Sequence, residues 1–342
     1  MTPVIETIDL VKHFPIHGGF LGRRVEHLKA VDSVSFSVEA GETLGLVGES
    51  GCGKTTVGHL VLNLLRPDRG KVLYRGQDLG ALQGEALRRV RRNLQIVFQD
   101  PQSSLDPRML VKKTVGYPLE VNRLARGAEV VARVRSMLAE VGLDGDHMYR
   151  YPHEFSGGQR QRIGIARALI TGPEFVVFDE PTSALDVSVQ AQILNLIKDL
   201  QRRHGYSYLF ISHNLSVIKH VSHRVAVMYL GKIVEAAPRS VLFERPLHPY
   251  TRALLTSVPR PDPAKRHALV VLSGDVPSPV NVPGGCRFHP RCPEVMAHCR
   301  SVAPPSVEVE PGHSVVCHLY GGAANRQNAT ELPGSERGGK GA

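Results

Sequence analysis

The sequence has no stretch that approaches the roughly 20 consecutive apolar residues of a membrane-spanning helix. Its first residues, MTPVIETIDL, also lack the basic and apolar regions of a secretory signal peptide. We therefore expect a soluble, cytosolic chain that meets any membrane only through partner proteins.

Cysteine is scarce, with five residues in a chain of 342. Because the cytosol keeps thiols reduced, structural disulfides are not expected. Cys52 lies in a glycine-rich segment and is predicted to be a small filler. The other four lie close together near the C-terminus, at Cys286, Cys292, Cys299 and Cys317.

The net charge of +10 does not select a partner by itself. A positive surface suits nucleic acid, an anionic membrane or phosphorylated ligands, and it equally suits a solvated basic surface. The apolar fraction of 42% is enough for a sizeable core. The composition is therefore that of an ordinary globular protein.

Residues 1–240 alternate β-branched runs with helical patterns, which predicts an α/β domain. A predominantly helical stretch at about 101–170 indicates an inserted helical subdomain. Residues 241–320 change in composition and are expected to form a small, cysteine-containing C-terminal domain, followed by a disordered tail at 321–342. The clearest strands are predicted at 42–47, 94–98, 174–178, 208–211 and 224–229.

A phosphate-binding loop follows the first of these strands and precedes a helix predicted at 56–65. Residues 48–55, GESGCGKT, fit the pattern G-x-x-x-x-G-K-[ST], in which glycines let backbone N–H groups surround phosphates. Lys54 is expected to meet the β- and γ-phosphates of ATP, and the Thr55 hydroxyl to bind Mg²⁺. The residues predicted to bind ATP here are Gly48, Ser50, Gly51, Gly53, Lys54, Thr55 and Thr56.

An acidic pair ends the predicted strand at 174–178. Asp179 is expected to hold the hydration shell of Mg²⁺, and Glu180 to polarise the attacking water. Two carboxylates at a strand end are common on protein surfaces, and it is their combination with a phosphate loop that indicates nucleotide hydrolysis.

A second glycine-bearing helix start, FSGGQ at 155–159, opens a helix predicted at 160–170. At this point the sequence resembles the ATP-binding cassette family, whose signature motif usually has Leu first. The resemblance implies a phosphate-loop NTPase cassette with a mixed sheet, working as a dimer in which the signature of one subunit closes over the nucleotide of the other. It assigns the signature to Ser156, Gly157, Gly158 and Gln159.

The same resemblance identifies further motifs in their expected order. Gln99 is similar to the family's Q-loop glutamine, a ligand of the metal or water, and His213 to its switch histidine. Ser183 and Asp186 lie in a segment that resembles its D-loop. The catalytic residues implied are thus Glu180, His213 and Gln99, with Thr55, Gln99 and Asp179 at Mg²⁺. Asn214 departs from the family's usual Asp, which leaves the fine tuning of the switch open.

Adenine requires an aromatic face, and Phe14 is placed like the family's A-loop aromatic residue. An insertion at 17–28 follows it, so Phe20 or His27 could serve instead, and Phe14 could be a core residue.

Residues 245–255, RPLHPYTRALL, resemble the C-terminal extension of oligopeptide and dipeptide importer ATPases. Residues 98–101 and 104–108 also resemble that group, and its second ATPase type more than its first. The resemblance implies import of peptides by a complex at the cytoplasmic face of the inner membrane. Its expected partners are two transmembrane permease subunits, a second homologous ATPase as heterodimer partner and an extracytoplasmic peptide-binding protein, with no nucleic acid.

The four C-terminal cysteines suit Zn²⁺ or a [4Fe–4S] cluster, although they lack paired C-x-x-C spacing. Members of the resembling group carry a [4Fe–4S] cluster in this region, which makes the cluster the expected cofactor beside ATP and Mg²⁺. Zinc, with a histidine in place of a cysteine (His289, His298, His313 or His318), and free or redox-active cysteines stay open as alternatives.

Two other functions compete with transport. A soluble cassette ATPase acting on nucleic acid or ribosomes would use the positive charge, but such proteins generally carry two cassettes or a long coiled coil. A regulatory subunit with little hydrolysis is disfavoured by Glu180 and His213. The transported substrate is not determined by this chain.

Overall fold

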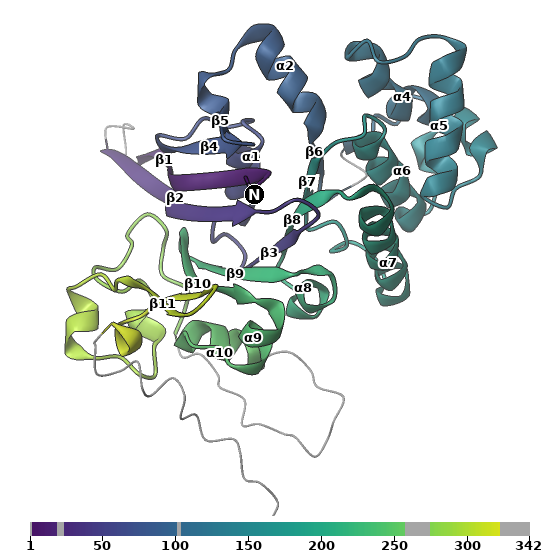
Figure 1. The fold of residues 1–342 in the computed structure, drawn as a ribbon. Helices are drawn as coiled ribbons and strands as arrows, with labels where there is room; N and C mark the ends of the chain where they lie inside the picture. Colours follow the sequence, from purple (N-terminus) through teal and green to yellow (C-terminus); the bar gives the residue numbers. More distant parts are fainter. Residues whose placement is uncertain (1, 19–23, 101–103, 257–273, 322–342) are drawn as a thin grey trace, which may run out of the picture.

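The computed structural model describes residues 2–18, 24–100, 104–256 and 274–321. Within these ranges the chain forms two β-sheets with helices packed around them (Figure 1). No helix in the same ranges is both long enough and apolar enough to cross a bilayer.

The smaller sheet is antiparallel and has the strand order β2-β1-β4-β5. Its strands are β1 (Ile5–Gly18), β2 (Arg24–Val38), β4 (Arg69–Tyr74) and β5 (Gln77–Asp78). Strands β1 and β2 pair along nearly their whole length, in a register that places Phe14 opposite Leu28. Phe14 and Leu28 both line a large cavity at this border of the sheet.

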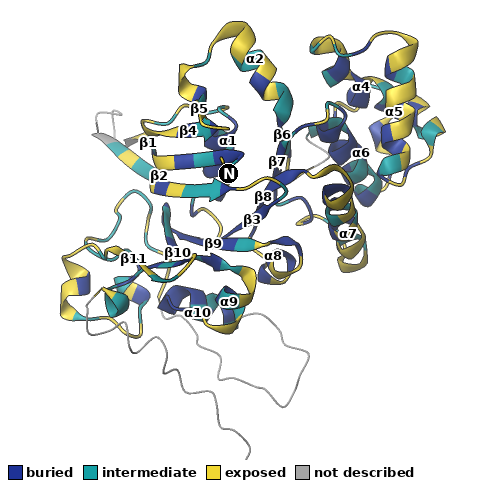
Figure 2. Ribbon diagram, in the orientation of Figure 1, coloured by how far each residue is buried: buried dark blue, intermediate teal, exposed yellow. Residues whose placement is uncertain are grey.

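The larger sheet is mixed and has the order β11-β12-β10-β9-β3-β8-β7-β6. Strands β6, β7, β8, β3 and β9 are parallel, whereas β10, β12 and β11 pair antiparallel at one side. Every residue of β3, β7 and β8 is buried, because parallel strands are covered on both faces (Figure 2). The bounds are β3 (Thr43–Val47), β6 (Leu94–Val97), β7 (Phe175–Asp179), β8 (Ser207–Ser212), β9 (Arg224–Tyr229), β10 (Lys232–Pro238), β11 (Ser306–Glu310) and β12 (His313–Val316).

The neighbouring parallel strands β6, β7, β8 and β3 bring four chemically important segments to one edge. Gln99 follows β6, Glu180 follows β7, His213 follows β8 and the phosphate loop follows β3. Ligands bind at such an edge because the carboxyl ends of the strands leave a crevice there.

Helices cover both sheets, and three of them lie between β6 and β7 in the chain. Helix α1 contacts strands of both sheets, and α4, α5 and α6 pack together as the helical subdomain to one side (Figure 1). The helices are α1 (Lys54–Val61), α2 (Gly84–Asn93), α4 (Val111–Val121), α5 (Ala128–Glu140), α6 (Gly157–Leu169), α7 (Val187–His204), α8 (Leu215–Val221), α9 (Arg239–Glu244) and α10 (Pro249–Thr256), with 3-10 turns η1 (Leu79–Ala81), η2 (Gly145–Tyr149), η3 (Pro152–Glu154), η5 (His289–Arg291), η6 (Ala297–Arg300) and η7 (His318–Tyr320).

The C-terminal region is built onto the larger sheet. Strand β12 pairs with β10, and β11 pairs with β12. Tyr250 and Phe288 are fully buried and belong to the same core as the residues of β7, β8 and β9. The predicted tail at 321–342 lies, apart from Gly321, outside the described residues.

Some predicted element bounds were wrong. The helix expected at 56–65 begins at Lys54 and ends at Val61, because Asn63 adopts a left-handed backbone conformation with φ of 51°. The helix expected at 160–170 begins earlier, at Gly157, where Ser156 caps its first turn. For the five strands predicted above, no end differs from the structure by more than one residue.

Candidate nucleotide-binding site

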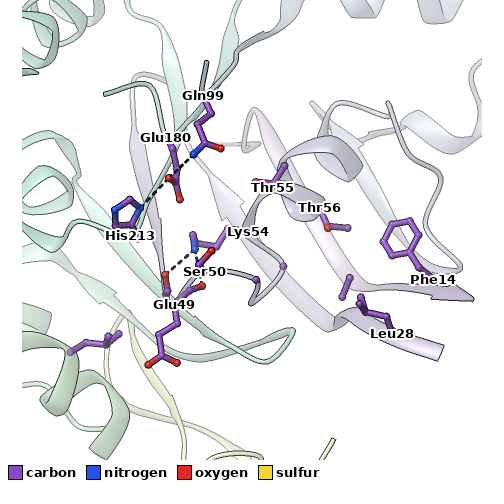
Figure 3. Close-up of a pocket in the computed structure, with 15 residues that line it drawn as sticks. Phe14, Leu28, Glu49, Ser50, Lys54, Thr55, Thr56, Gln99, Glu180 and His213 are labelled. Atoms are coloured by element: carbon purple, nitrogen blue, oxygen red, sulfur yellow. Dashed lines mark hydrogen bonds and ion pairs between the residues drawn. The ribbon is translucent and has the colours of Figure 1, made fainter. Parts of the chain in front are cut away.

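A cavity of about 670 Å³ opens at the carboxyl edge of the larger sheet (Figure 3). Phe14 and Leu28 lie at one end of it, and Gln99, Glu180 and His213 lie at the other. The phosphate loop runs between them. Its lining residues are Phe14, Leu28, Ala30, Gly48, Glu49, Ser50, Gly51, Gly53, Lys54, Thr55, Thr56, Gln99, Glu180, His213 and Leu254.

The phosphate loop depends on glycine at two positions. A Cβ on Gly53 would lie 2.0 Å from the carbonyl oxygen of Ala30, and the residue has φ of 107°, which side chains strongly disfavour. A Cβ on Gly48 would lie 2.2 Å from the carbonyl oxygen of Met228. The loop therefore sits directly against the backbone of strands β2 and β9.

Lys54 supplies a fixed positive charge within the loop. Its side chain is buried, and its Nζ donates to the carbonyl oxygens of Gly48 at 2.8 Å and Glu49 at 3.0 Å. Because these acceptors are uncharged, the ammonium charge stays available to anionic phosphates. Cys52, within the loop, is buried, and burial raises the pKa of its thiol, as suits the small filler predicted.

Thr55 and Asp179 meet below the loop. The Thr55 hydroxyl donates to the Oδ1 of Asp179 at 3.1 Å, and burial raises the pKa of that carboxyl. Hydroxyl and carboxylate oxygens are the ligands Mg²⁺ prefers, and a cation would offset the cost of keeping the Asp179 carboxylate charged in a dry position. The two residues thus fit the magnesium ion expected of them.

Two side chains converge on one carboxylate oxygen, the Oε2 of Glu180. The Nε2 of Gln99 donates to the Oε2 of Glu180 at 3.2 Å, and the Nδ1 of His213 lies 3.0 Å from the same oxygen (Figure 3). The sequence motifs that carry these residues are 33 and 81 positions from Glu180. Strand pairing in the sheet brings them together.

The backbone of Glu180 is strained and firmly held. Its φ of 46° lies in the left-handed region, which costs a non-glycine residue on the order of 1–3 kcal/mol. Its N–H donates to the carbonyl of Ile211 at 3.0 Å, and its carbonyl accepts from the N–H and the hydroxyl of Ser183 at 3.2 and 3.1 Å. These hydrogen bonds hold the residue in its left-handed conformation at the end of β7.

Phe14 lies at the far end of the cavity from Glu180. It lines the pocket beside Leu28, and the Nζ of Lys12 lies 5.7 Å from its ring centre. Of the two alternatives, His27 is exposed, pairs across the strands with Pro15 and does not line the cavity. Phe20 lies outside the described residues.

The signature and D-loop residues do not line this cavity. Ser156 is exposed and caps α6, with its Oγ accepting from the N–H of Gln159 at 3.3 Å and the Gln159 side chain accepting from the N–H of Ser156 at 3.0 Å. Ser183 and Asp186 are exposed as well. Gly157 and Gly158 follow Ser156 at the start of α6, where Gly158 is buried against Val189.

Asn214 has a local structural role. Its Oδ1 accepts from the N–H groups of Ser216 and Val217, so it caps helix α8. Aspartate caps a helix equally well, because both side chains offer a carbonyl-type oxygen. Asn214 in place of the usual Asp therefore preserves the cap of α8, the helix that follows His213.

The four C-terminal cysteines are partly or fully buried. Burial, together with the charges of neighbouring thiols, raises the pKa of Cys292 to about 11 and that of Cys317 to about 12. Thiolates are the donors that zinc and iron–sulfur clusters take, and a bound metal would stabilise them, so the chemistry of these side chains suits such a group.

A smaller group of metal-binding atoms overlaps the cysteines. The ligand atoms of His298, Cys299 and His318 lie within 4.8 Å of one another. Two imidazoles and a thiolate are typical zinc ligands. Of the histidines considered as zinc ligands, His313 instead contacts the buried Glu235 at 2.8 Å, and His289 the carbonyl of Cys286 at 2.9 Å.

Sequence reasoning missed several residues at the cavity. Leu28 and Ala30 come from β2, and Leu254 comes from α10, far along the chain. Glu49 occupies a variable position of the phosphate-loop motif, yet it forms contacts with the C-terminal region. No local pattern reveals these residues, because distant segments place them.

Comparisons with known proteins agree with this geometry. Residues 31–183 match the family described as ABC transporter, and residues 234–299 match the oligopeptide/dipeptide transporter, C-terminal region. The chain is 50% identical over 320 residues to the oligopeptide transport ATP-binding protein AppF of Bacillus subtilis (strain 168), covering 93% of this chain and 97% of that protein. It is 49% identical to the probable peptide ABC transporter ATP-binding protein y4tS of Sinorhizobium fredii, covering 94% and 91%.

The fold also has solved counterparts. The dimeric post-hydrolysis state of the ATP-binding cassette MJ0796, bound to ADP and Pi, superposes with a TM-score of 0.61 at 26% identity and covers 69% of this chain and 98% of that one. A second dimeric structure of the same cassette gives a TM-score of 0.60 at 27% identity, with the same coverage.

Proposed function

Since this chain belongs to the ATP-binding cassette transporter family, among its oligopeptide and dipeptide transport ATP-binding proteins, we propose that it binds and hydrolyses ATP to power peptide import. The observation that carries the hydrolysis step is the Glu180 carboxylate, held by Gln99 and His213 at the phosphate end of the cavity. The peptide substrate follows from the relatives, whose names state oligopeptide and peptide transport.

ATP lies along the cavity in this proposal. Its adenine stacks near Phe14, and its phosphates reach the loop at 48–56, where backbone N–H groups, the Lys54 ammonium and the start of α1 attract anions. Thr55 and Asp179 would hold Mg²⁺, which would supply positive charge to the phosphates.

Glu180 acts as the general base in hydrolysis. Gln99 and His213 both contact its Oε2, which orients the carboxylate toward the γ-phosphate end of the cavity. Glu180 takes up the proton of the attacking water, and the His213 imidazole donates to charge that develops on the phosphate. These roles use side chains that the fold has already brought together.

A second ATPase subunit completes the site. Ser156, Ser183 and Asp186 are exposed and lie outside the cavity of their own chain, so they are free to face a nucleotide held by a partner. The helix start at Gly157 and Gly158 suits a phosphate, because backbone N–H groups there are unpaired within the helix. The solved relative MJ0796 is dimeric, and we propose a homologous ATPase as the partner here.

The helical subdomain is the proposed contact with two permease subunits in the inner membrane, on its cytoplasmic face. It exposes several large apolar side chains: Tyr117 and Val121 on α4, Tyr149 at the end of η2, and Tyr151 just after it. The N–H of Val111 at the start of α4 donates to the carbonyl of Arg150, which joins these two segments. Exposed apolar groups on a small subdomain favour a protein partner. An extracytoplasmic peptide-binding protein would deliver the substrate.

We propose a [4Fe–4S] cluster as the group held by Cys286, Cys292, Cys299 and Cys317, with zinc on His298, Cys299 and His318 as the alternative. Both would act by holding the C-terminal region in shape, because that region has only a small apolar cluster of its own. Iron, acid-labile sulfide and zinc analysis of the purified chain distinguishes the two, and the absence of all three would remove this part of the proposal.

The test of the function is Glu180→Gln in the membrane complex, assayed for phosphate release with and without peptide-loaded binding protein. Loss of a general base is expected to slow turnover by about 10²–10⁴-fold while ATP binding is kept. Glu174→Gln is the matched control, because Glu174 immediately precedes β7 at its opposite end and bonds Tyr74 and Arg75 instead.

Wild-type turnover that rises with loaded binding protein and collapses only in Glu180→Gln supports a peptide-import motor. Turnover that needs no membrane partner would instead indicate a soluble cassette ATPase. Equal turnover of Glu180→Gln and wild type would contradict the assigned base.

A further inference from the structure

An ion pair ties the phosphate loop to the C-terminal region. Arg291 uses both terminal nitrogens to contact the Glu49 carboxylate, with distances of 3.0 and 3.2 Å from Nη1 and 3.2 Å from Nη2. The Arg291 side chain is 8% exposed and that of Glu49 25%. A forked contact of this kind fixes direction as well as distance, and burial protects it from solvent.

The same loop residue is also held by its backbone. The N–H of Glu49 donates to the hydroxyl of Tyr250 at 3.0 Å, and Tyr250 is fully buried at the start of α10. The Glu49 carbonyl accepts from Lys54. Two of the three polar groups of Glu49 are therefore engaged by residues beyond position 249, and its N–H is occupied by the Tyr250 hydroxyl.

The segment Cys286–Cys292 carries further contacts to the ATP-binding region. Arg287 forms a hydrogen-bonded ion pair with Asp32 of β2. Phe288 is 1% exposed and packs edge to face on Tyr229 of β9, with ring centres 5.3 Å apart. Together with Arg291, three of the five residues between the two cysteines contact this region, and they hold the segment against strands β2 and β9, which flank the phosphate loop.

We propose that Arg291 is a positioning residue of the ATP site, which holds Glu49 and through it the phosphate loop. The affinity for nucleotide then depends on how the Cys286–Cys292 segment is held in place. The inference rests on the proposed function, since it concerns the same site. Arg291 lines no part of the cavity, and its effect is carried by the loop.

The first experiment measures ATP affinity by calorimetry in the full-length Glu180→Gln chain, in which hydrolysis is suppressed. Arg291→Met and Glu49→Gln are each expected to raise the Kd for ATP by about tenfold, as for the loss of a hydrogen-bonded charge pair. The double variant should be no worse than either single one, because both remove the same contact. Arg291→Lys should recover part of the affinity, since it keeps the charge without the fork.

Arg245→Met is the matched control. Arg245 also pairs with a carboxylate in the C-terminal region, Glu310 at 2.9 Å, but on the exposed surface. Its Kd should equal that of the parent chain. The melting temperature of each variant is measured in parallel, and Glu49→Gln, which preserves shape, serves if Arg291→Met does not fold.

The second experiment asks whether the cysteine segment acts through the ion pair. Cys292→Ser is expected to weaken ATP binding in the chain with Arg291 and to have no further effect in Arg291→Met. Metal content is recorded for each sample. An unchanged Kd in Cys292→Ser would overturn the dependence on the segment, whatever the metal content.

The outcomes separate this inference from the function itself. A parent chain that does not bind ATP would contradict the proposed function. If the parent chain binds ATP and both Arg291→Met and Glu49→Gln bind it with the same Kd as the parent, only the positioning role is overturned. A rise in KM for ATP with little change in kcat, in chains that retain Glu180, is the kinetic signature expected of a positioning residue.

Discussion

Individual residues along the carboxyl edge of the sheet differ in how much change they tolerate, and the phosphate loop shows this within three positions. Gly51 and Gly53 both have a positive φ, of 79° and 107°. A Cβ at Gly51 meets nothing within 4 Å, whereas one at Gly53 would overlap the Ala30 carbonyl. The first position therefore needs glycine for its backbone angle alone, and the second also needs it for space.

Gly53→Ala and Gly51→Ala separate these two causes. In the nucleotide-free chain, Gly51→Ala should cost about 1–2 kcal/mol of unfolding free energy from backbone strain alone. Gly53→Ala should cost more, because the Ala30 carbonyl cannot move without disturbing β2. Denaturant unfolding of the two variants measures the difference, and equal losses would show that the loop relaxes away from the contact.

At the scale of elements, the junction between β10 and α10 depends on a buried network of polar groups. Glu235 of β10 is 1% exposed and accepts from the N–H groups of Leu247 and His248, at 2.8 and 2.9 Å, and from His313 at 2.8 Å. The Nδ1 of His248 accepts from the N–H of Tyr250 at 3.0 Å. This network positions the helix start that carries Tyr250, and so the contact with the phosphate loop.

The His248 network predicts a dependence of stability on pH. Burial lowers the pKa of His248 to about 4 from 6.5, although the Glu235 charge opposes the shift and Arg252 adds to it. The unfolded chain therefore binds this proton first as pH falls. The stabilisation from neutral His248 is complete above about pH 6.5 and is lost progressively toward pH 4. At pH 5 the loss in unfolding free energy is about 2 kcal/mol.

His248→Asn is the variant that isolates this effect, because its amide oxygen can still accept from the N–H of Tyr250. The unfolding free energy should fall between pH 7.5 and pH 5 in both proteins. The fall should be smaller in the variant than in wild type, by about 2 kcal/mol. The comparison cancels every other group that titrates in this range. Parallel pH profiles would show that His248 is not the source.

At the scale of the whole molecule, the C-terminal region and the ATP-binding region share one sheet and one core. Strands β11 and β12 continue the larger sheet beyond β10, and Phe288 and Tyr250 pack on Tyr229 of β9. The ion pair between Arg291 and Glu49 then joins this shared core to the nucleotide cavity.

Truncation after residue 240 tests this unity. It exposes the edge of β10 and the buried face of Tyr229, so we expect a large fall in melting temperature and aggregation through the open strand edge. Truncation after residue 321, which removes only the segment predicted as a tail, should leave the melting temperature unchanged. A soluble 1–240 fragment with wild-type stability would show that the two regions fold independently.

The sequence by itself determined the nucleotide chemistry and the class of fold. The phosphate loop, the acidic pair and the FSGGQ segment are local patterns, because each depends on a short run of backbone that surrounds phosphate or starts a helix. Buried β-branched runs likewise predicted the parallel strands, and their bounds differed from the structure by about one residue. Helix α1 was misjudged at its end because the left-handed turn at Asn63 has no strong local signal.

Only the tertiary structure decided how separate segments act on one another. The convergence of Gln99 and His213 on one oxygen of Glu180, and of Arg291 and Tyr250 on Glu49, depends on strand order and on packing between residues far apart in the chain. Such contacts leave no periodic trace in the sequence, since each joins residues that lie far apart in the chain. The attachment of the cysteine-bearing region to the phosphate loop was invisible for that reason.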